Sequence, residues 1–589
     1  MRSVRWQNCC RMALAARIWR EEGNMEYMIF LGLVIVFVAA VIGKDIYNDR
    51  KKKKRFEQDL RKNYGVLRER KLNLERFARM DRYYQKHQEQ DQIDDITWND
   101  LGMDDVFLGM NHTYSATGEE YLYYLLRSVG KDADSINKLE NLITFFMEHE
   151  DQRVYVQLLM AKLGYMGKYS LYDYIDNLDY LGERKNTKAI ICNLLFLPLL
   201  GLLPFAFSYA IFGIVGLMIY NITSYFKEKS DIEPYIISFQ YVLKLLQAGE
   251  KLEALPGEKP AELEEVLKKL AEDRKVLTPL RRGSFWVTSG SMSMSGNPTD
   301  ILIDYLKMSF HVDLIKFNQM LAFLRSHVET VDRINTTLGR IETAIAIGAW
   351  RTGLSKKNGY CIPRFHDASD LTLRIENGYH PQISEPVKNS ITATNGVLLT
   401  GSNASGKSTF LKMTALNAVL AQTVHTCVAD AYEAPLFRIF SSMSLRDDLQ
   451  GGDSYYVVEI KALKRILTAA KEPGRPVLCF VDEVLRGTNT VERIAASTQI
   501  LKSFDGKAVL CFAATHDIEL TSLLEKQFTN YHFEEEIKDG DVLFQYRLLS
   551  GKATTRNAIK LLEIIGYDAE VIEKAQSQAE SFLETGKWA

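Results

Sequence analysis

The sequence predicts a multidomain protein with an α/β domain at its C-terminal end, preceded by a long all-α region that carries membrane-crossing helices. Three observations support this prediction. The 589 residues are too many for one hydrophobic core. Short apolar runs alternate with helical patterns after about Cys361. Two long uncharged stretches, near residues 30 and 205, interrupt an otherwise polar helical region.

The composition is that of a folded protein, with 46% hydrophobic residues, 25% charged residues and a net charge of −2. Global charge therefore gives no support for nucleic-acid binding, which would need a local basic patch. The cysteines show no metal-ligand spacing, which favours reduced, mostly buried thiols of a cytosolic protein over a disulfide framework. They are Cys9, Cys10, Cys192, Cys361, Cys427, Cys479 and Cys511.

The first uncharged stretch, Tyr27–Gly43, has 17 residues and is just long enough to cross a bilayer. The basic run Arg50–Arg55 follows it, which predicts a membrane anchor whose C-terminal end lies in the cytoplasm. A cleaved signal peptide and a buried helix are the alternatives, but no convincing cleavage site precedes the basic run. The sequence leaves open whether Met1 or Met25 is the start.

The second stretch, Ala189–Tyr220, has 32 residues without a charge, too many for one membrane helix and few for two. Pro198, Gly201 and Pro204 are able to break it. Lysines flank both ends, which favours a tight membrane hairpin with both ends in the cytoplasm. A pair of buried core helices is the alternative. Each leg of about 16 residues measures about 24 Å, so whether the hairpin spans a hydrocarbon core of about 30 Å stays open.

These patterns divide the chain into six parts. In order they are a leader of uncertain status (1–24), the anchor with a basic helical stalk (25–90), a helical core-like region (91–187), the membrane hairpin (188–226), a second helical region (227–360) and the α/β domain with a helical tail (361–589).

A phosphate-binding loop opens the α/β domain. Residues 398–413 read LLTGSNASGKSTFLKM, which contains the pattern G-x-x-x-x-G-K-[ST] between an apolar strand and a helix. Backbone N–H groups and the helix N-terminus attract phosphate, Lys407 reaches the outer phosphates, and the Ser408 hydroxyl ligates Mg²⁺. We expect ATP and Mg²⁺ to be bound by Gly401, Ser402, Asn403, Ala404, Ser405, Gly406, Lys407, Ser408 and Thr409.

Hydrolysis requires a second element, which VLCFVDEVLRGTNT (477–490) provides. Asp482 ends an apolar strand and is expected to hold Mg²⁺ together with Ser408, while Glu483 positions the attacking water. Two solvated acids at a strand end are the alternative. His516 ends a third strand, AVLCFAATHD, where it can sense the γ-phosphate. The sequence thus predicts an ATPase, a P-loop NTP hydrolase with Lys407, Glu483 and His516 as catalytic residues.

The segments around these motifs resemble the MutS family. SLRDDLQGGDSYYVVEIKALKRIL (444–467) resembles its signature region, and GYHPQI, DEVLRGTNT, ATHDIEL and the tail from YRLLSGKATTRNAIKLL onward follow in the family's order. The resemblance implies a P-loop NTPase domain of the ABC/MutS type after a helical core and lever region. It implies that Ser454 reaches across a dimer to the partner's nucleotide and that His516 is a switch residue. It places Asn389 near the base, although the aromatic residue expected just before it is absent.

The departures from the family bear on function. Members that read mismatches carry an N-terminal reader domain with a Phe-x-Glu wedge, whereas here the core-like region begins near residue 96 and the anchor precedes it. Phe146 and Glu148 form such a pattern, but their amphipathic helix favours a core position. An ABC-transporter ATPase is disfavoured because no Leu-Ser-Gly-Gly signature precedes the Asp-Glu strand.

We therefore expect a multi-pass protein of the cell membrane with its ATPase domain in the cytoplasm. It would form a homodimer through the ATPase domains, contact membrane lipid and close on a partner when ATP binds. DNA, bound without mismatch specificity, is one candidate partner. The alternative is a membrane-associated, ATP-driven interaction or remodelling module that binds no DNA. The sequence identifies neither the partner nor the pathway.

Overall fold

The computed structural model of the chain divides into two compact units, Met1–Tyr64 and Gly65–Ala589. In the first unit, residues 47–62 are helical and the basic run Arg50–Arg55 is exposed. The leader and the expected anchor up to residue 42 lie outside the described residues. The structure describes residues 43–44, 47–66, 74–130, 132–167, 169–288, 298–402, 405–443, 455–485, 488–538, 541–553, 559, 562 and 565–585.

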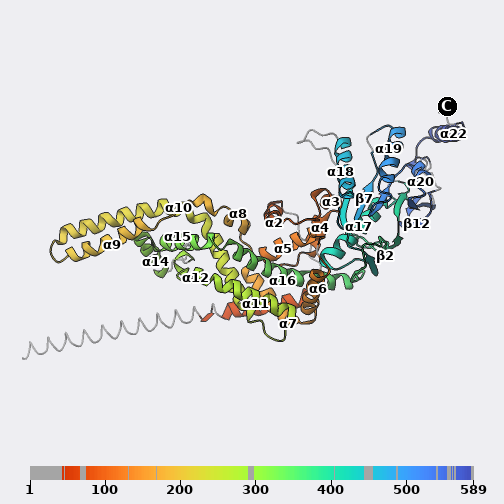
Figure 1. The fold of residues 1–589 in the computed structure, drawn as a ribbon. Helices are drawn as coiled ribbons and strands as arrows, with labels where there is room; N and C mark the ends of the chain where they lie inside the picture. The colour runs from red at the N-terminus through yellow and green to blue at the C-terminus, as the bar shows by residue number, and fades with distance from the viewer. Residues whose placement is uncertain are drawn as a thin grey trace, which may run out of the picture. The chain divides into compact units, whose positions relative to one another are not determined.

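The second unit begins with a helical region, in agreement with the sequence pattern (Figure 1). Its elements are α2 (Leu74–Lys86), α3 (Asp95–Asp100), α4 (Met103–Met110), α5 (Ala116–Arg127), α6 (Ala133–Glu148), α7 (Glu150–Leu163), α8 (Leu171–Ile175), the 3-10 helix η1 (Leu178–Leu181), α9 (Thr187–Leu202), α10 (Phe207–Glu253), α11 (Ala261–Val276), α12 (Thr278–Arg281), α13 (Phe285–Thr288), α14 (Pro298–Phe310), α15 (Val312–Arg325) and α16 (Val328–Ser355).

Helix α16 lies at the centre of this region and packs against α5 and α6. Glycines allow the close crossing of α16 and α5. A Cβ atom added at Gly339 would lie 2.7 Å from the Thr117 carbonyl oxygen, and one added at Gly118 would collide with the Glu342 side chain. Phe146 is fully buried on α6, as expected from the sequence, while Glu148 of the same Phe-x-Glu pattern is exposed.

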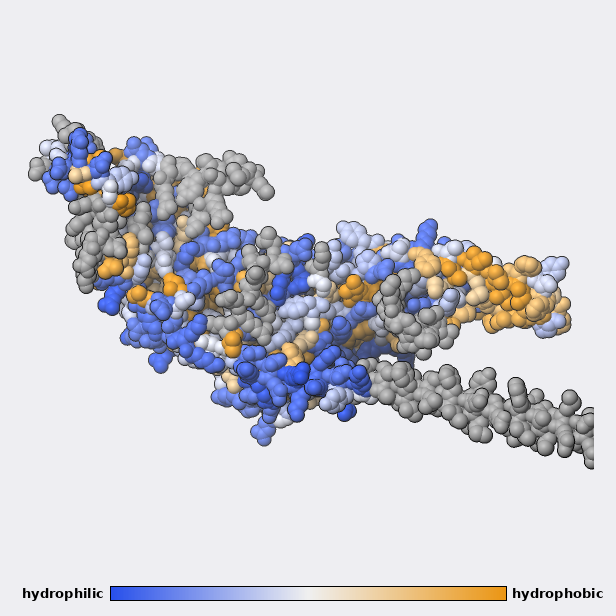
Figure 2. Space-filling model, turned by 180° about the vertical axis from the view of Figure 1, so that it is seen from behind, coloured by the Kyte–Doolittle hydropathy of each residue, from blue (hydrophilic) through white to orange (hydrophobic). Residues whose placement is uncertain are grey.

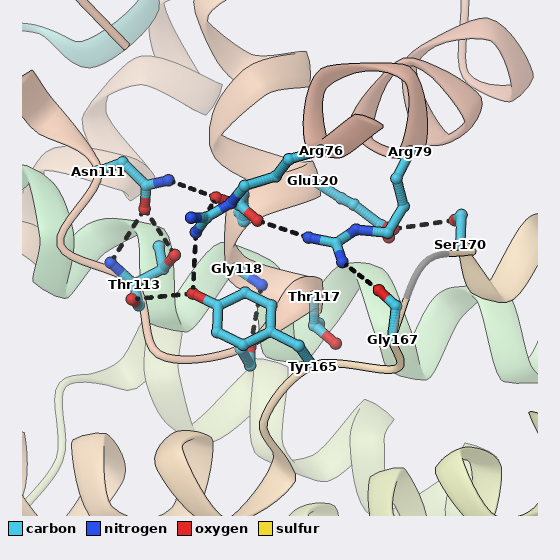
Figure 3. Close-up of polar contacts among 12 residues, drawn as sticks. Arg76, Arg79, Asn111, Thr113, Thr117, Gly118, Glu120, Tyr165, Gly167 and Ser170 are labelled. Atoms are coloured by element: carbon cyan, nitrogen blue, oxygen red, sulfur yellow. Dashed lines mark hydrogen bonds and ion pairs between the residues drawn. The ribbon is translucent and has the colours of Figure 1, made fainter. Parts of the chain in front are cut away.

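A buried polar cluster fastens α2 to α5 (Figure 3). Arg79 donates to Glu119 Oε2 at 2.9 Å, Asn111 donates to Glu119 Oε1 at 2.6 Å, and Ser170 donates to Glu120 Oε1 at 2.8 Å. Burial raises the pKa of Glu120 to about 8. The sequence places Leu74–Lys86 in a stalk, but the structure packs this part of it into the helical region, where Arg76 and Arg79 both pair with the buried carboxylate of Glu119 on α5.

The apolar stretch Ala189–Tyr220 forms a helical hairpin, α9 and α10, as expected. The turn lies at Pro204, whereas Pro198 and Gly201 lie inside α9 and do not break it. A Cβ atom added at Gly213 of α10 would lie 2.7 Å from Leu199 Cδ2, so glycine permits the close approach of the two helices. Helix α10 then continues to Glu253 and crosses the domain boundary expected at residue 226. The helix does not end there because no sufficiently strong helix-breaking signal separates its apolar part from its amphipathic part.

The hairpin surface is apolar and exposed. Among the described residues, α10 is the one helix long and apolar enough to cross a membrane, and only 11% of its most apolar stretch is buried; α9 is a shorter apolar helix. Phe205, Tyr209 and Phe212 are 88%, 80% and 78% exposed. Figure 2 shows continuous apolar surface over this hairpin. The alternative of a buried core helix pair is therefore wrong for these residues.

Two asparagines fasten the base of the hairpin to the end of α14. Asn193 donates to the Phe310 carbonyl and Asn221 to the Ser309 carbonyl, both at 2.7 Å. The last carbonyls of a helix have no partner within the helix, so side-chain amides stabilise its end. These contacts fix the level at which the hairpin leaves the helical region.

The C-terminal part is α/β, with helices packed around a six-stranded sheet of order β12-β9-β4-β8-β7-β6. All its neighbouring strands are parallel except the antiparallel pair β12 and β9. A second sheet has the order β1-β5-β2-β3, and β10 pairs with β11. The strands are β1 (Arg364–Phe365), β2 (Leu373–Gly378), β3 (Asn389–Ala393), β4 (Gly396–Thr400), β5 (Ala431–Ala434), β6 (Arg438–Ser442), β7 (Val477–Asp482), β8 (Val509–Ala514), β9 (Phe528–His532), β10 (Glu535–Lys538), β11 (Asp541–Phe544) and β12 (Leu549–Ser550), and the helices are α17 (Lys407–Val424), α18 (Tyr455–Ala469), α19 (Thr490–Lys502), α20 (Glu519–Leu523) and α22 (Ala569–Thr585).

An ion-pair cluster joins the helical region to the α/β part. Arg351 of α16 forms a bidentate contact with Glu140 of α6, at 2.8 and 2.7 Å, and donates to the His425 carbonyl beyond α17 at 2.8 Å. His425 Nδ1 lies 2.9 Å from Glu140 Oε2. Burial alone would raise the pKa of Glu140, but Arg351 and His425 lower it to about 2. The carboxylate is therefore charged and shared between both parts of the unit.

Candidate functional site

The phosphate loop connects β4, inside the sheet, to α17. Gly401 has φ +144° and Gly406 has φ +110°, a backbone region that favours glycine. A Cβ atom added at Gly401 would lie 2.7 Å from the Phe533 carbonyl oxygen. The loop thus turns tightly and ends at the N-terminus of α17, where backbone N–H groups attract anions. Asn403 and Ala404 lie outside the described residues.

Lys407 lies on the first turn of α17 and is only 5% exposed. Its Nζ donates to the carbonyl oxygens of Gly401 and Ser402, each at 2.7 Å. The ammonium group is therefore held within the loop, where it can exchange these carbonyl oxygens for phosphate oxygens. Ser408 and Thr409, the next two residues, are exposed and line the same cavity.

The carboxyl ends of β7 and β8 bring the predicted acidic residues and histidine together. Glu483 follows β7, and its Oε1 lies 2.8 Å from His516 Nε2, beyond β8. Asp482 Oδ1 is buried and accepts no hydrogen bond from any residue of the described part of the chain. A buried carboxylate oxygen without a donor fits a cation, and oxygen ligands are those that Mg²⁺ prefers. Asp482 and Ser408 are the residues that would hold it.

The turn after β7 has a strained backbone. Glu483 and Leu485 have φ values of +58° and +60°, which residues other than glycine rarely adopt. The buried carboxylate of Glu459 on α18 accepts a hydrogen bond from the Leu485 N–H and so holds this turn. Glu459 belongs to the segment 444–467 that resembles the family's signature region, but the sequence pattern does not predict its contact with this turn. The structure connects the signature helix to the turn that carries Glu483.

A cavity of about 590 Å³ lies beside the loop and is lined by loop residues, Glu483, His380, Asn389 and Tyr546. Asn389 Nδ2 donates to the Tyr546 carbonyl at 2.9 Å. The sequence offers no aromatic residue just before Asn389, but Tyr546, 157 residues later, lines the same cavity. Burial lowers the pKa of His380 to about 4, so its imidazole is neutral near pH 7.

Ser454, the predicted residue for the partner's nucleotide, lies outside the described residues. Helix α18 begins at the next residue, Tyr455. Within the described residues, the predicted loop, the Asp-Glu pair and the histidine lie at one end of one sheet. The arrangement can hold a polyphosphate with a cation beside a carboxylate.

Comparisons with known proteins point to one family. The family model described as MutS domain V matches residues 397–583. The DNA mismatch repair protein MutS of Thermus thermophilus is 33% identical over 243 residues, which are 40% of this chain and 29% of that protein. MutS of Lactobacillus acidophilus is 30% identical over 265 residues, 43% of this chain and 30% of that protein. The chain thus spans about 30% of the length of these relatives. The residues that the family model matches include the phosphate loop, Asp482, Glu483 and His516.

Proposed function

Since this chain is a member of the MutS family through its C-terminal region, we propose that it binds and hydrolyses ATP with Mg²⁺. The proposal rests on one observation: the loop Gly401–Thr409, Asp482 and the Glu483–His516 pair lie at the ends of three neighbouring strands. A phosphate cradle beside a positioned carboxylate is the arrangement that water attack on a γ-phosphate requires.

Each side chain has a role in this proposal. Lys407 releases the carbonyl oxygens of its own loop and takes up the outer phosphates. Ser408 and Asp482 would hold Mg²⁺, which would supply positive charge beside the phosphate oxygens. Glu483 accepts a hydrogen bond from the attacking water once His516 no longer occupies its Oε1 atom. His516 is then free to face the γ-phosphate. The Glu483–His516 pair thereby couples the presence of this phosphate to the position of the Glu483 carboxylate.

The adenine would occupy the part of the cavity formed by Asn389, His380 and Tyr546. Tyr546 lines this cavity and can stack on a base, a contact worth about 1–3 kcal/mol. The amide of Asn389 orients the Tyr546 backbone by accepting from Leu548 N–H at 2.8 Å and donating to the Tyr546 carbonyl. A Tyr546→Phe variant should keep nucleotide affinity, whereas Tyr546→Ala should weaken it about tenfold or more.

Nucleotide binding by the purified protein tests this proposal. Lys407→Ala should abolish binding of a fluorescent ATP analogue, because the phosphates lose their point charge. Lys464→Ala, a change at an exposed lysine of α18, is the matched control and should bind normally. Equal affinity of the Lys407→Ala and native proteins would contradict the proposed site.

We also propose that the ATPase domains form a homodimer in which Ser454 of each chain completes the site of the other. The support is the resemblance of residues 444–467 to the family's signature region and the contact of Glu459, five residues after Ser454, with the turn beside Glu483. Contact with a partner's nucleotide at Ser454 would thereby act on the catalytic turn through α18.

Membrane attachment is the next part of the proposal, with the ATPase domain in the cytoplasm of a cell-membrane protein. The exposed apolar side chains of α9 and α10 support it, because a patch of this kind is seldom left in water. The exposed basic run Arg50–Arg55 fits the cytoplasmic surface of the bilayer. We propose that the hairpin inserts from the cytoplasmic side and returns, with its base at Asn193 and Asn221.

The partner that dimer closure acts on is proposed to be DNA, since the relatives are named as DNA mismatch repair proteins. Because Phe146 of the Phe-x-Glu pattern is buried in α6 and cannot reach a base pair, we expect homoduplex and mismatched duplex to bind alike. The second candidate, a protein or membrane partner remodelled by the same closure, is favoured by the exposed hairpin. Photo-crosslinking of the membrane-bound protein in cells with ATP separates the two: recovered DNA supports the first, and recovered protein alone supports the second.

A further inference from the structure

Cys361 and Cys427 lie opposite each other on two antiparallel backbone segments. The Cys361 N–H donates to the Cys427 carbonyl and the Cys427 N–H to the Cys361 carbonyl, both at 2.9 Å, and the two residues form an isolated bridge. Residues that exchange both hydrogen bonds in this way have Cα atoms about 5.5 Å apart. Disulfides need a Cα separation of about 4.4–6.8 Å, and this backbone lies within that range. The Cβ atoms of a hydrogen-bonded pair are about 5 Å apart and must approach by about 1 Å for the bond to form.

The two thiols differ in their surroundings. Cys427 is fully buried, and its Sγ donates to the Asn417 carbonyl of α17 at 3.5 Å. Cys361 is partly exposed, so a small oxidant can reach it. The neighbouring Cys427 side chain lowers the pKa of Cys361, whereas burial raises the pKa of Cys427. Cys361 is therefore the more reactive thiol and Cys427 lies in contact with it.

We propose that Cys361 and Cys427 are a modification site at which a peroxide forms a reversible disulfide. The Cys361 thiolate attacks one peroxide oxygen, which breaks the O–O bond, leaves a sulfenic acid and releases water after protonation. The Cys427 sulfur then attacks the sulfenic sulfur, and a second water leaves with the Cys427 proton. In total two thiols lose two electrons and one peroxide is reduced to two waters. A cellular dithiol reverses the reaction by thiol–disulfide exchange.

The position of this pair connects it to the rest of the molecule. Cys361 follows the end of α16, and Cys427 follows α17, whose first turn carries Lys407. Arg351 already ties α16 to this segment through the His425 carbonyl and the Thr426 hydroxyl, the latter at 2.8 Å. A disulfide adds a covalent link at the same junction, so oxidation restrains motion between the helical region and the phosphate loop. The resulting slower ATP turnover rests on the proposed function, but the disulfide itself does not.

Peptide mass mapping of the full-length, detergent-solubilised protein tests the site. Treatment with dilute hydrogen peroxide should give a linked pair of peptides containing Cys361 and Cys427, lighter by two hydrogens and separated again by dithiothreitol. In the Cys427→Ser variant, Cys361 should instead stop at the sulfenic acid and be captured by dimedone. Cys479 and Cys511 are the control pair, since they lie opposite each other on β7 and β8 but are buried, and they should stay unlinked.

Whether the Cys361–Cys427 disulfide forms is measured on the native protein, so a variant that fails to fold does not affect this test. Absence of the Cys361–Cys427 peptide, or linkage of Cys479 to Cys511 at the same rate, would overturn the proposal. An ATPase rate that falls on oxidation and recovers with dithiothreitol, but is unchanged in Cys361→Ser, would support the effect on turnover. A linked peptide in a protein with no ATPase activity at all would uphold the modification site and count against the proposed function instead.

Discussion

The proposed insertion of the hairpin into the bilayer has a depth that follows from the length of its helices. From Asn221, which is fastened to α14, to Phe207 at the start of α10 there are 14 residue steps. At about 1.5 Å per residue the tip lies about 21 Å beyond the base. A hydrocarbon core is about 30 Å thick, so a hairpin that enters from one face ends inside the bilayer and crosses it only in part.

Tryptophan placed at two levels measures this depth in the full-length protein reconstituted in vesicles. With Phe205→Trp, at the tip, emission should be quenched by bromines attached deep in the acyl chains. With Ile219→Trp, near the base, bromines close to the headgroup should quench more strongly. The unsubstituted protein, with its six tryptophans, provides the background.

Tyr180 provides a matched control, because it is 85% exposed, nearly as much as the 88% of Phe205, but lies outside the hairpin. Tyr180→Trp should be quenched by aqueous iodide and not by brominated lipid. Equally strong quenching of Phe205→Trp and Tyr180→Trp by iodide would refute the proposed insertion of the hairpin tip, since the tip would then lie in water.

Three further predictions concern the rest of the chain. Arg351→Met should lower the free energy of unfolding by less than the about 3–5 kcal/mol expected for an uncompensated buried charge, because the half-buried Glu140 keeps His425 as its one charged partner; Arg351→Lys in the same urea titration should lose less. Stability should fall as pH rises from 4.5 to 8, because folded Glu120, with its pKa raised to about 8, keeps a proton that the unfolded chain has released. Thermal unfolding of Glu120→Gln should depend less on pH in this window, and an unchanged dependence would refute the assignment. Mixing inactive Lys407→Ala and Ser454→Ala chains should restore activity in mixed dimers; none in proven mixed dimers would count against shared sites.

Local sequence patterns were sufficient to predict the features that arise from neighbouring residues. The loop Gly401–Thr409 depends on glycines that tolerate positive φ, and the strand before Asp482 is a continuous apolar run. The hairpin follows from charge-free length and from its helix-breaking residues. Each of these signals lies within about 30 residues, so no knowledge of tertiary contacts is needed.

Contacts between distant segments could not be predicted. Tyr546 reaches Asn389 only because β3 and the strand preceding Tyr546 are brought to one cavity by the fold. Cys361 and Cys427 look like isolated thiols until α17 and the second sheet place them opposite each other. The charged helix Leu74–Lys86 resembles a solvated stalk because a sequence does not reveal that two of its arginines meet the buried carboxylate of Glu119.

Steady-state ATP hydrolysis by the purified native protein, Glu483→Gln and Lys407→Ala tests the central claim most directly. If Glu483 positions the attacking water, Glu483→Gln should bind nucleotide like the native protein but turn over about 10²–10⁴-fold more slowly. Lys407→Ala should show neither binding nor turnover, and Glu264→Gln, at an exposed carboxylate of α11, should match the native rate. A native rate no higher than that of Lys407→Ala, or a Glu483→Gln rate equal to the native one, would contradict the account.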